Sequence, residues 1–359
     1  MIEDAPGTGP PGTGRALGHA GESEAVGAAT EEGAAGRFPE QRGRRSLQRI
    51  GERWSLVLAF LGAFVFFSAA RPDTFLTWDN ARAILDDSSP LCVLAVGVTV
   101  ILLINEFDLS VGFVAGLAGA AGVSVMAYQG WGAGAAVAVA LGAGAAAGLA
   151  NGIGVAYLRI PSFIATLAVG SIATAIELAI AKTAIFEGLS LSYLNIATTR
   201  VASVPLRAVI AAGVALIFMV ILRTTLYGRH ASSIGDNPTA ARLTGVPVER
   251  VRVIAFVLAG LTAGIAAVLI TSSGGQYYPN LGTGYLLPAY AAAFLGLSLS
   301  GGLRFNVLGS YLGVLLLGML STGLTMMNQP SWTTQLVQGI VLIVAVGGIA
   351  LRRRGAVGR

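Results

Sequence analysis

Two carboxylates lie in a short polar stretch between apolar runs, and they are the first candidates for chemistry in this sequence. Glu106 and Asp108 belong to residues 105–110, which read NEFDLS. Carboxylates this close to hydrocarbon are costly and usually functional. At an interfacial loop, Asp108 would cap the next helix through amides two or three residues on. As a break inside a membrane, the stretch would bind solute hydroxyls or lock a gate. We expect a substrate path here, formed by Asn105, Glu106, Asp108 and Ser110.

A third carboxylate lies inside an apolar run. Glu177 is five residues from Lys182, not the four residues that best align a helical ion pair. Glu177 is therefore expected to face the interior of a helix bundle and to join the path, whereas Lys182 extends to the outer interface.

The composition predicts that these groups are held inside a membrane protein. Of 359 residues, 54% are hydrophobic and 11% charged, against about 25% charged in soluble domains. The single cysteine, Cys92, excludes an intramolecular disulfide and a cysteine-cluster metal site, and His19 and His230 are too far apart for a helical metal pair. We expect no catalytic residues and no metal site. Nucleic acid is not expected as a partner, because the arginines lie between apolar runs without a binding motif.

The apolar runs define the elements that position the candidates. A helix that crosses a bilayer needs about 20 residues, so two of the runs, 91–104 and 286–299, are expected to be broken or re-entrant. The sequence predicts an all-α integral membrane protein with about ten transmembrane helices, some short or broken. The ten runs are 55–70, 91–104, 111–128, 133–157, 163–183, 208–222, 253–271, 286–299, 306–327 and 332–351.

The basic residues predict the orientation. If all ten runs cross the membrane, both termini lie on the same side, and most of the 23 basic residues lie on that side too. The side with the excess of basic residues is expected to be cytoplasmic. Residues 1–53 form a disordered tail that is basic near the membrane, residues 54–351 the transmembrane domain, and residues 352–359 a basic tail. The five basic residues expected at the outer face are Arg71, Arg82, Lys182, Arg200 and Arg207.

Glycines at close spacing in the run 133–157 predict close helix packing. Gly142, Gly144, Gly148 and Gly152 lack side chains that would keep a neighbouring backbone away. Helix packing in lipid depends on such close approach, because hydrocarbon gives no hydrophobic drive between helices.

The cytoplasmic loop 223–252 carries signals for a short helix. Asn237 can cap it, Pro238 suits its first position, residues 239–243 provide a turn or two, and Gly245 can end it. Such a helix, bracketed by arginines, can dock into a cleft of a partner protein. The alternative is a solvated connector whose charges only set the topology.

Four ordered motifs resemble the permease subunits of bacterial ABC importers for ribose and related monosaccharides. The resemblance covers roughly residues 84–352, and its motifs are FDLSVG (107–112), NGIGVAYLRIPSFIATL (151–167), IGDNPTAARLTGV in the cytoplasmic loop and LSLSGG (297–302). Ala240, Ala241 and Gly245 match the Ala, Ala and Gly of the importers' EAA coupling motif, while Thr239 stands where that motif has Glu.

The resemblance implies a transport subunit of the bacterial inner membrane. Its partners would be ATPase subunits, an extracytoplasmic sugar-binding protein, membrane lipid and a second permease copy, in a homodimer or heterodimer. ATP and Mg would bind the ATPase, because the only lysine, Lys182, follows Ala181 and cannot form a phosphate-binding Gly-Lys-Ser/Thr step. No cofactor is expected on this chain. The residues implied in coupling to the ATPase are Asn237, Ala240, Ala241, Arg242 and Gly245.

The substrate expected from the resemblance is a monosaccharide. The alternatives are a nucleoside or another small polar solute, or a gradient-driven secondary transporter. Polar and aromatic residues of an outer loop could bind a sugar or dock its binding protein, or could form an interfacial aromatic belt. They are Gln276, Tyr277, Tyr278, Asn280 and Tyr285.

Overall fold

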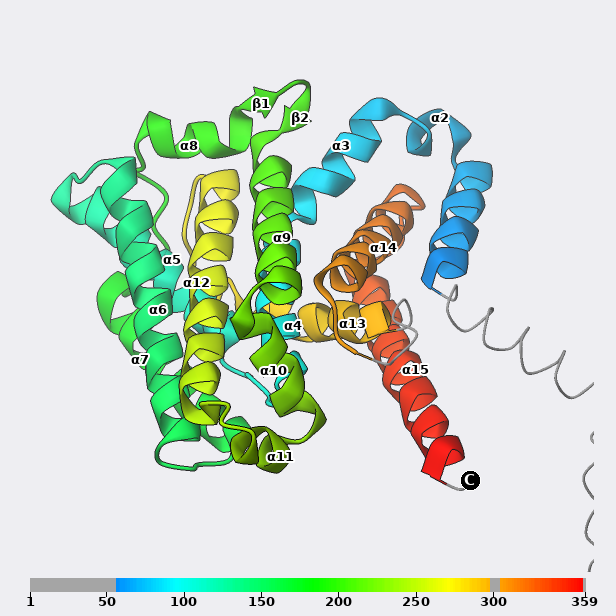
Figure 1. Cartoon of the computed structure of the whole chain (residues 1–359). Helices are drawn as coiled ribbons and strands as arrows, with labels where there is room; N and C mark the ends of the chain where they lie inside the picture. The colour runs from blue at the N-terminus through cyan, green and yellow to red at the C-terminus, as the bar shows by residue number, and fades with distance from the viewer. Residues whose placement is uncertain (1–55, 298–303, 358–359) are drawn as a thin grey trace, which may run out of the picture. The chain divides into compact units, whose positions relative to one another are not determined.

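The computed structural model describes residues 56–297 and 304–357, which are almost entirely helical (Figure 1). A first helix, Leu56–Ala70, precedes the labelled elements. These are α2 (Pro72–Phe75), α3 (Trp78–Asp87), α4 (Ser89–Leu103), α5 (Val111–Gln129), α6 (Ala133–Ala156), α7 (Ser162–Ala181), α8 (Leu191–Thr198), β1 (Arg200–Val201), β2 (Val204–Pro205), α9 (Leu206–Thr224), α10 (Leu226–Asp236), α11 (Pro238–Leu243), α12 (Val248–Gly274), η1 (Thr283–Tyr285), α13 (Leu286–Gly296), α14 (Val307–Met326) and α15 (Ser331–Val357).

Six of the described helices are long and apolar enough to cross a membrane: α5, α6, α7, α9, α12 and α14. A seventh span exists if α3 and α4, which meet at a bend of 45°, count as one. The short run 286–299 became α13, an 11-residue helix. The predicted all-helical membrane architecture is thus confirmed. The expected tail 1–53 and most of the LSLSGG motif lie outside the described residues.

The close approach of α6 and α12 follows from the glycines of α6. A Cβ atom at Gly144 would lie 2.2 Å from the carbonyl oxygen of Gly260, and one at Gly148 would lie 2.3 Å from that of Phe256. At Gly152 it would lie 2.8 Å from the Cα atom of Val253. The packing prediction is confirmed for these three positions. It is wrong for Gly142, which has nothing within 4 Å of that point.

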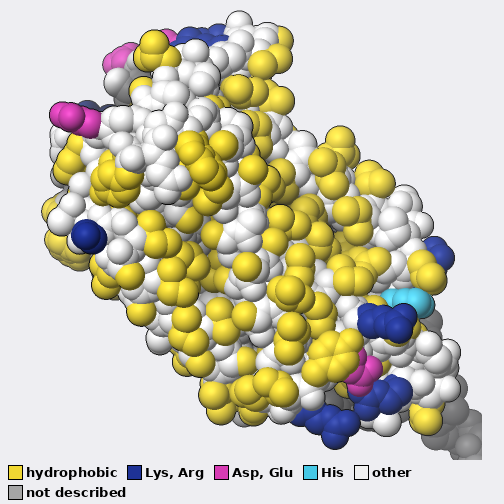
Figure 2. Space-filling view, turned by 90° about the vertical axis from the view of Figure 1, so that its left-hand side faces the viewer, with side chains coloured by type: hydrophobic (Ala, Val, Ile, Leu, Met, Phe, Trp, Pro, Cys, Tyr) yellow, Lys and Arg dark blue, Asp and Glu magenta, His cyan; other side chains and the backbone are white. Residues whose placement is uncertain are grey.

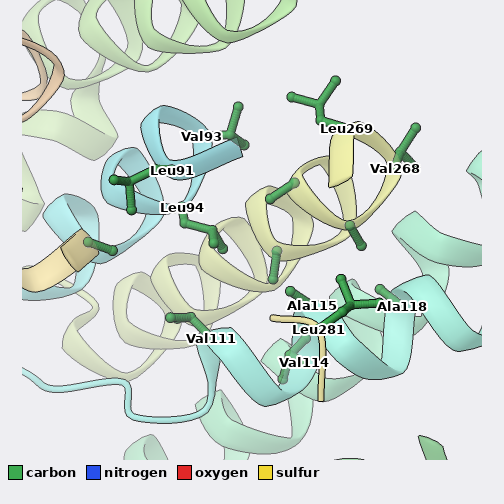
Figure 3. Packing of buried hydrophobic residues seen from close by; sticks show 14 of the residues in the cluster. Leu91, Val93, Leu94, Val111, Val114, Ala115, Ala118, Val268, Leu269 and Leu281 are labelled. Carbon is green, nitrogen blue, oxygen red and sulfur yellow. The ribbon is translucent and has the colours of Figure 1, made fainter. Parts of the chain in front are cut away.

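Helix α4 lies in the core of the fold. Almost all of its residues are buried, because α12, α13, α14 and α9 all pack against it. Figure 3 shows Leu94 of α4 beside α12, with Val111 and Val114 of α5 close by.

Charged and apolar surfaces are separated as a membrane protein requires. Figure 2 shows hydrophobic side chains over the middle of one face, with most charged side chains towards its two ends. Helix α8 and the β1–β2 hairpin lie at one end of the spans, and α10 and α11 lie at the other (Figure 1). The short antiparallel pair β1–β2 is the only sheet within residues 56–297 and 304–357.

Candidate functional site

The connection between α4 and α5, residues 104–110, is held by groups from two other helices. The backbone N–H of Phe107 donates to Ser162 Oγ at 3.2 Å, and that of Leu109 donates to Thr166 Oγ1 at 3.1 Å. Both acceptors belong to the first turns of α7. The Asp108 N–H donates to Tyr290 Oη of α13 at 2.8 Å. The connection is therefore a fixed part of the helix bundle.

Asp108 orders the start of α5. Its Oδ1 accepts hydrogen bonds from the Ser110 N–H at 2.8 Å and from the Ser110 hydroxyl at 2.5 Å. This is the local bonding that an aspartate preceding a helix provides. The Asn151 amide of α6 donates to Ser110 Oγ at 2.7 Å. The motifs FDLSVG and NGIGVAYLRIPSFIATL thus contact each other through buried hydrogen bonds.

Glu106 forms an ion pair with the first turns of α12. Its Oε1 lies 2.9 Å from Arg252 Nη2, and the side chains are 13% and 23% exposed, respectively. Asn105, next to it, is exposed and has a φ of 59°, a left-handed conformation that Asn tolerates better than most residues. The carboxylate of Glu106 thus has a cationic partner in this conformation. Its path role stays a prediction.

Glu177 faces the bundle interior, as the sequence predicts. Its side chain is fully buried, and its Oε1 accepts hydrogen bonds from Tyr277 Oη at 2.7 Å and from the Asn280 N–H at 2.8 Å. A Cβ atom at Gly116 of α5 would lie 2.6 Å from Glu177 Oε2, so only glycine leaves room there. Glu177 therefore joins α5, α7 and the connection that follows α12. The hydrogen-bond partners of Glu177 are Tyr277 and Asn280, and it contacts neither Glu106 nor Asp108 by a hydrogen bond among the described residues.

The connection after α12 is partly internal. Tyr277 is completely buried and pairs through its backbone with Ile185, so it does not belong to an exposed aromatic belt. Tyr278, in contrast, is 47% exposed. Nearby, Tyr193 of α8 shares a hydrogen bond of 2.6 Å with Thr271. Burial raises the pKa of Tyr193 to about 12, which keeps its hydroxyl protonated.

The helix predicted within loop 223–252 is confirmed as α11. The Asn237 Oδ1 accepts from the N–H groups of Thr239 and Ala240, each at 3.0 Å, and Pro238 is the first helical residue. Gly245 has a φ of 85°, the conformation that glycine adopts most readily after a helix. These local signals depend only on neighbouring residues, which is why the sequence reveals them.

The two sides of α11 differ in exposure. Ala240 and Arg242 are exposed, and Arg242 forms an ion pair with Glu249. Ala241 is 4% exposed and packs with α10 and α12, so a bulky residue there would press on the chain's own core. Leu243 is 85% exposed. Leu243 was not among the residues predicted from the sequence, although an apolar residue in a polar, capped segment is a usable signal.

The side chains around residues 104–110 and those of α11 are suited to hydrogen bonding and to mechanical support. Among residues 56–297 and 304–357, no three His, Cys, Asp or Glu side chains gather closely enough to hold a metal ion. The buried hydroxyl, amide and carboxylate groups around residues 104–110 can exchange hydrogen-bond partners, and α11 presents an exposed apolar side chain. The arrangement can therefore bind a polar solute or transmit a displacement.

Comparison with known proteins identifies close relatives over most of the chain. A family model described as branched-chain amino acid transport system / permease component matches residues 80–346. The ribose import permease protein RbsC of Escherichia coli is 33% identical over 85% of this chain and 96% of its own length. The L-arabinose ABC transporter permease protein AraH of Azospirillum brasilense is 31% identical, covering 85% of this chain and 89% of the relative. An autoinducer 2 import system permease protein, LsrC of an Enterobacter species, is 33% identical, covering 80% and 84%.

Proposed function

The chain belongs to the family of permease components of branched-chain amino acid transport systems, and we propose that it is the membrane-spanning subunit of an ATP-driven importer for a monosaccharide. The ribose and L-arabinose permeases match it almost end to end. These two relatives favour a sugar over an amino acid as its substrate.

The other components of this importer are separate chains. We assign ATP and Mg to ATPase subunits, and delivery of the sugar to an extracytoplasmic binding protein. A second permease copy completes the membrane assembly in the bacterial inner membrane. The absence of any lysine other than Lys182 supports an ATP site elsewhere.

In this assembly the chain has about ten membrane crossings and both termini in the cytoplasm. The concentration of arginine in loop 223–252 and in the segments around both termini supports this orientation. The separation of α8 from α10 and α11 at opposite ends of the spans agrees with it (Figure 1).

The observation that carries the proposal is the exposed Leu243 on α11. An apolar side chain that is 85% exposed at the end of a capped helix is suited to enter a pocket of a partner. Asn237 and Gly245 fix the ends of the helix, and the buried Ala241 fixes its inner side. We therefore propose that α11 docks into the ATPase with Leu243 as its anchor.

From α11, movement reaches residues 104–110 by contacts within the chain. Ala241 packs in one apolar cluster with Ile104 at the end of α4 and with Val251 of α12. One residue further along α12, Arg252 holds Glu106. ATP-driven displacement of α11 would therefore shift the proposed path residues Asn105, Glu106, Asp108 and Ser110.

A charge at the anchor tests this function. Leu243→Glu should abolish co-purification with the ATPase and sugar-stimulated ATP hydrolysis in reconstituted vesicles. The control is Leu191→Glu, which places the same charge at a residue 79% exposed on α8, at the other end of the spans. If Leu243→Glu assembles and hydrolyses ATP like the wild type, α11 is only a connector. Uptake would then be measured after dissipating the proton and sodium gradients, to test the secondary-transporter alternative. A panel of nucleosides and pentoses separates the two solute classes.

A further inference from the structure

A cleft of about 280 Å³ lies where the break between α3 and α4 meets η1, α14 and α15. Helix α3, on one side of the cleft, lies at the end of the bundle away from α11 (Figure 1). We call this cavity the Ser88 cleft. Most of its lining side chains are polar, although α14 is a transmembrane helix. They include Ser88, Tyr285, Thr322 and Gln338. Where such side chains line an open cleft, they can form hydrogen bonds with a polar solute.

Ser88 brings a hydroxyl without a protein partner to the cleft wall. The residue is 4% exposed, and its Oγ accepts or donates no hydrogen bond within the described part of the chain. Ser88 does not cap α4 with its side chain either. Buried hydroxyls are nearly always hydrogen-bonded, so an unpaired one beside a cavity points to a ligand that pairs with it.

Gly318 of α14 gives this buried hydroxyl its space. A Cβ atom at Gly318 would lie 2.1 Å from Ser88 Oγ, so any larger residue would force Ser88 out of its position. The glycine thus allows the unpaired hydroxyl to lie against α14, in the wall of the cleft.

The remaining groups are of the kinds that bind a neutral polyhydroxylated solute. Asp87 contributes a carboxylate whose side chain is 76% exposed, and Arg207 Nη2 lies 4.0 Å from its Oδ1. Arg207 is bonded mainly to Asp86, with Nε 2.8 Å from Oδ1. Asp87 therefore keeps free acceptor capacity for hydroxyl groups. Tyr285 adds an aromatic ring, and Gln338 adds an amide that both donates and accepts.

The volume of the cleft suits a small solute. Because a water molecule occupies about 30 Å³ of liquid, the 280 Å³ cleft has room for roughly nine water molecules. A pentose, with about ten non-hydrogen atoms, fits this space.

We propose that the Ser88 cleft is a transit site for a neutral polyhydroxylated solute of pentose size. The inference rests on the proposed function and deepens it, because it assigns the solute specific groups on this chain. The site is separate from residues 104–110 and from Glu177, so the path would contain at least two groups of polar contacts.

The first experiment measures occupancy without any partner protein. The full-length chain carrying Cys92→Ala and Thr322→Cys is placed in bacterial phospholipid vesicles and treated with a small methanethiosulfonate reagent. D-ribose at ten times its dissociation constant should slow modification about tenfold. L-leucine, of similar size, should not. The thiol introduced by Thr198→Cys on exposed α8 is the control and should react at the same rate with and without ribose. Equal rates at both thiols in the presence of ribose would overturn the proposal.

The second experiment measures transport by the assembled importer. Thr322→Val and Gln338→Leu should each raise the KM for ribose or arabinose uptake about three- to tenfold, since each removes a hydrogen bond. Thr174→Val on α7, whose hydroxyl bonds only its own helix at Gly170, should change nothing. If both cleft variants take up sugar with the wild-type KM, the cleft is not a transit site, and the proposed function is unaffected. If the wild type transports no sugar, the proposed function is wrong. The occupancy experiment alone then shows whether the cleft binds ribose.

A rescue pair separates steric from folding effects. Gly318→Ala alone should reduce membrane abundance, because its methyl group collides with Ser88 Oγ. Adding Ser88→Ala removes that oxygen and should restore abundance, yet uptake should stay low because the hydroxyl is lost. Full uptake by the double variant would contradict a role for Ser88 in binding.

Discussion

Arg252 on α12 and Glu106 on the α4–α5 connection are 146 positions apart in sequence, and their side chains meet at 2.9 Å. Arg252 lies in the second turn of α12, directly after the loop that contains α11. The pair therefore connects loop 223–252 to the motif that starts α5.

This ion pair should be energetically coupled. Glu106→Gln and Arg252→Gln should each destabilise the chain, and the double variant should be less affected than the sum, with a coupling of about 1–3 kcal/mol. Thermal unfolding of the purified chain in detergent measures this cycle. The comparison pair Arg242 and Glu249, with side chains 58% and 35% exposed, should show a coupling below about 1 kcal/mol. Equal coupling in the two pairs would contradict the structural distinction.

The order of α5 should depend on Asp108. Asp108→Ala leaves the Ser110 N–H without its acceptor and should cost about 1–2 kcal/mol. Asp108→Asn keeps an oxygen there and should cost less. Membrane abundance and thermal unfolding in detergent measure both variants, and a fully stable Asp108→Ala would remove the capping role. Comparing the uptake rates of Glu106→Gln and Asp108→Asn then tests which of the two carboxylates contacts the transported solute.

The glycines of α6 should differ in their tolerance of alanine. Gly148→Ala places a methyl group 2.3 Å from a carbonyl oxygen and should cost about 1–3 kcal/mol. Gly142→Ala meets open space and should be neutral or stabilising by up to about 1 kcal/mol, because glycine disfavours helix. Unfolding temperatures of the two variants give the comparison. Similar losses at both positions would show that helix propensity rather than helix contact decides the effect.

Thiol labelling tests the membrane orientation. In a Cys92→Ala background, an impermeant thiol reagent added to intact cells should modify a cysteine placed at Asn195 but not one at Asp236. Both positions are exposed, so accessibility depends on the side of the membrane. Labelling of Asp236→Cys with protection of Asn195→Cys would reverse the orientation inferred from the arginines.

The sequence revealed features that depend on a few neighbouring residues. The start of α11 at Asn237 and Pro238 is a local hydrogen-bonding pattern, and the shortness of α13 follows from the length of its apolar run. The long apolar helices follow from composition in the same way. The pairing of Glu106 with Arg252 was not predictable, because it requires the relative positions of α4 and α12. The burial of Ala241 was also not predictable, because in so short a helix the small and polar residues do not show which face packs against the protein.

The contact between α6 and α12 has a consequence for movement. At Gly144, Gly148 and Gly152 the two backbones touch directly, so no side chain between them can absorb a displacement by changing its rotamer. Over this contact, residues 144–152 of α6 and 253–264 of α12 are therefore expected to move as one unit. Relative movement is expected instead at the breaks between helices, such as the 45° bend between α3 and α4.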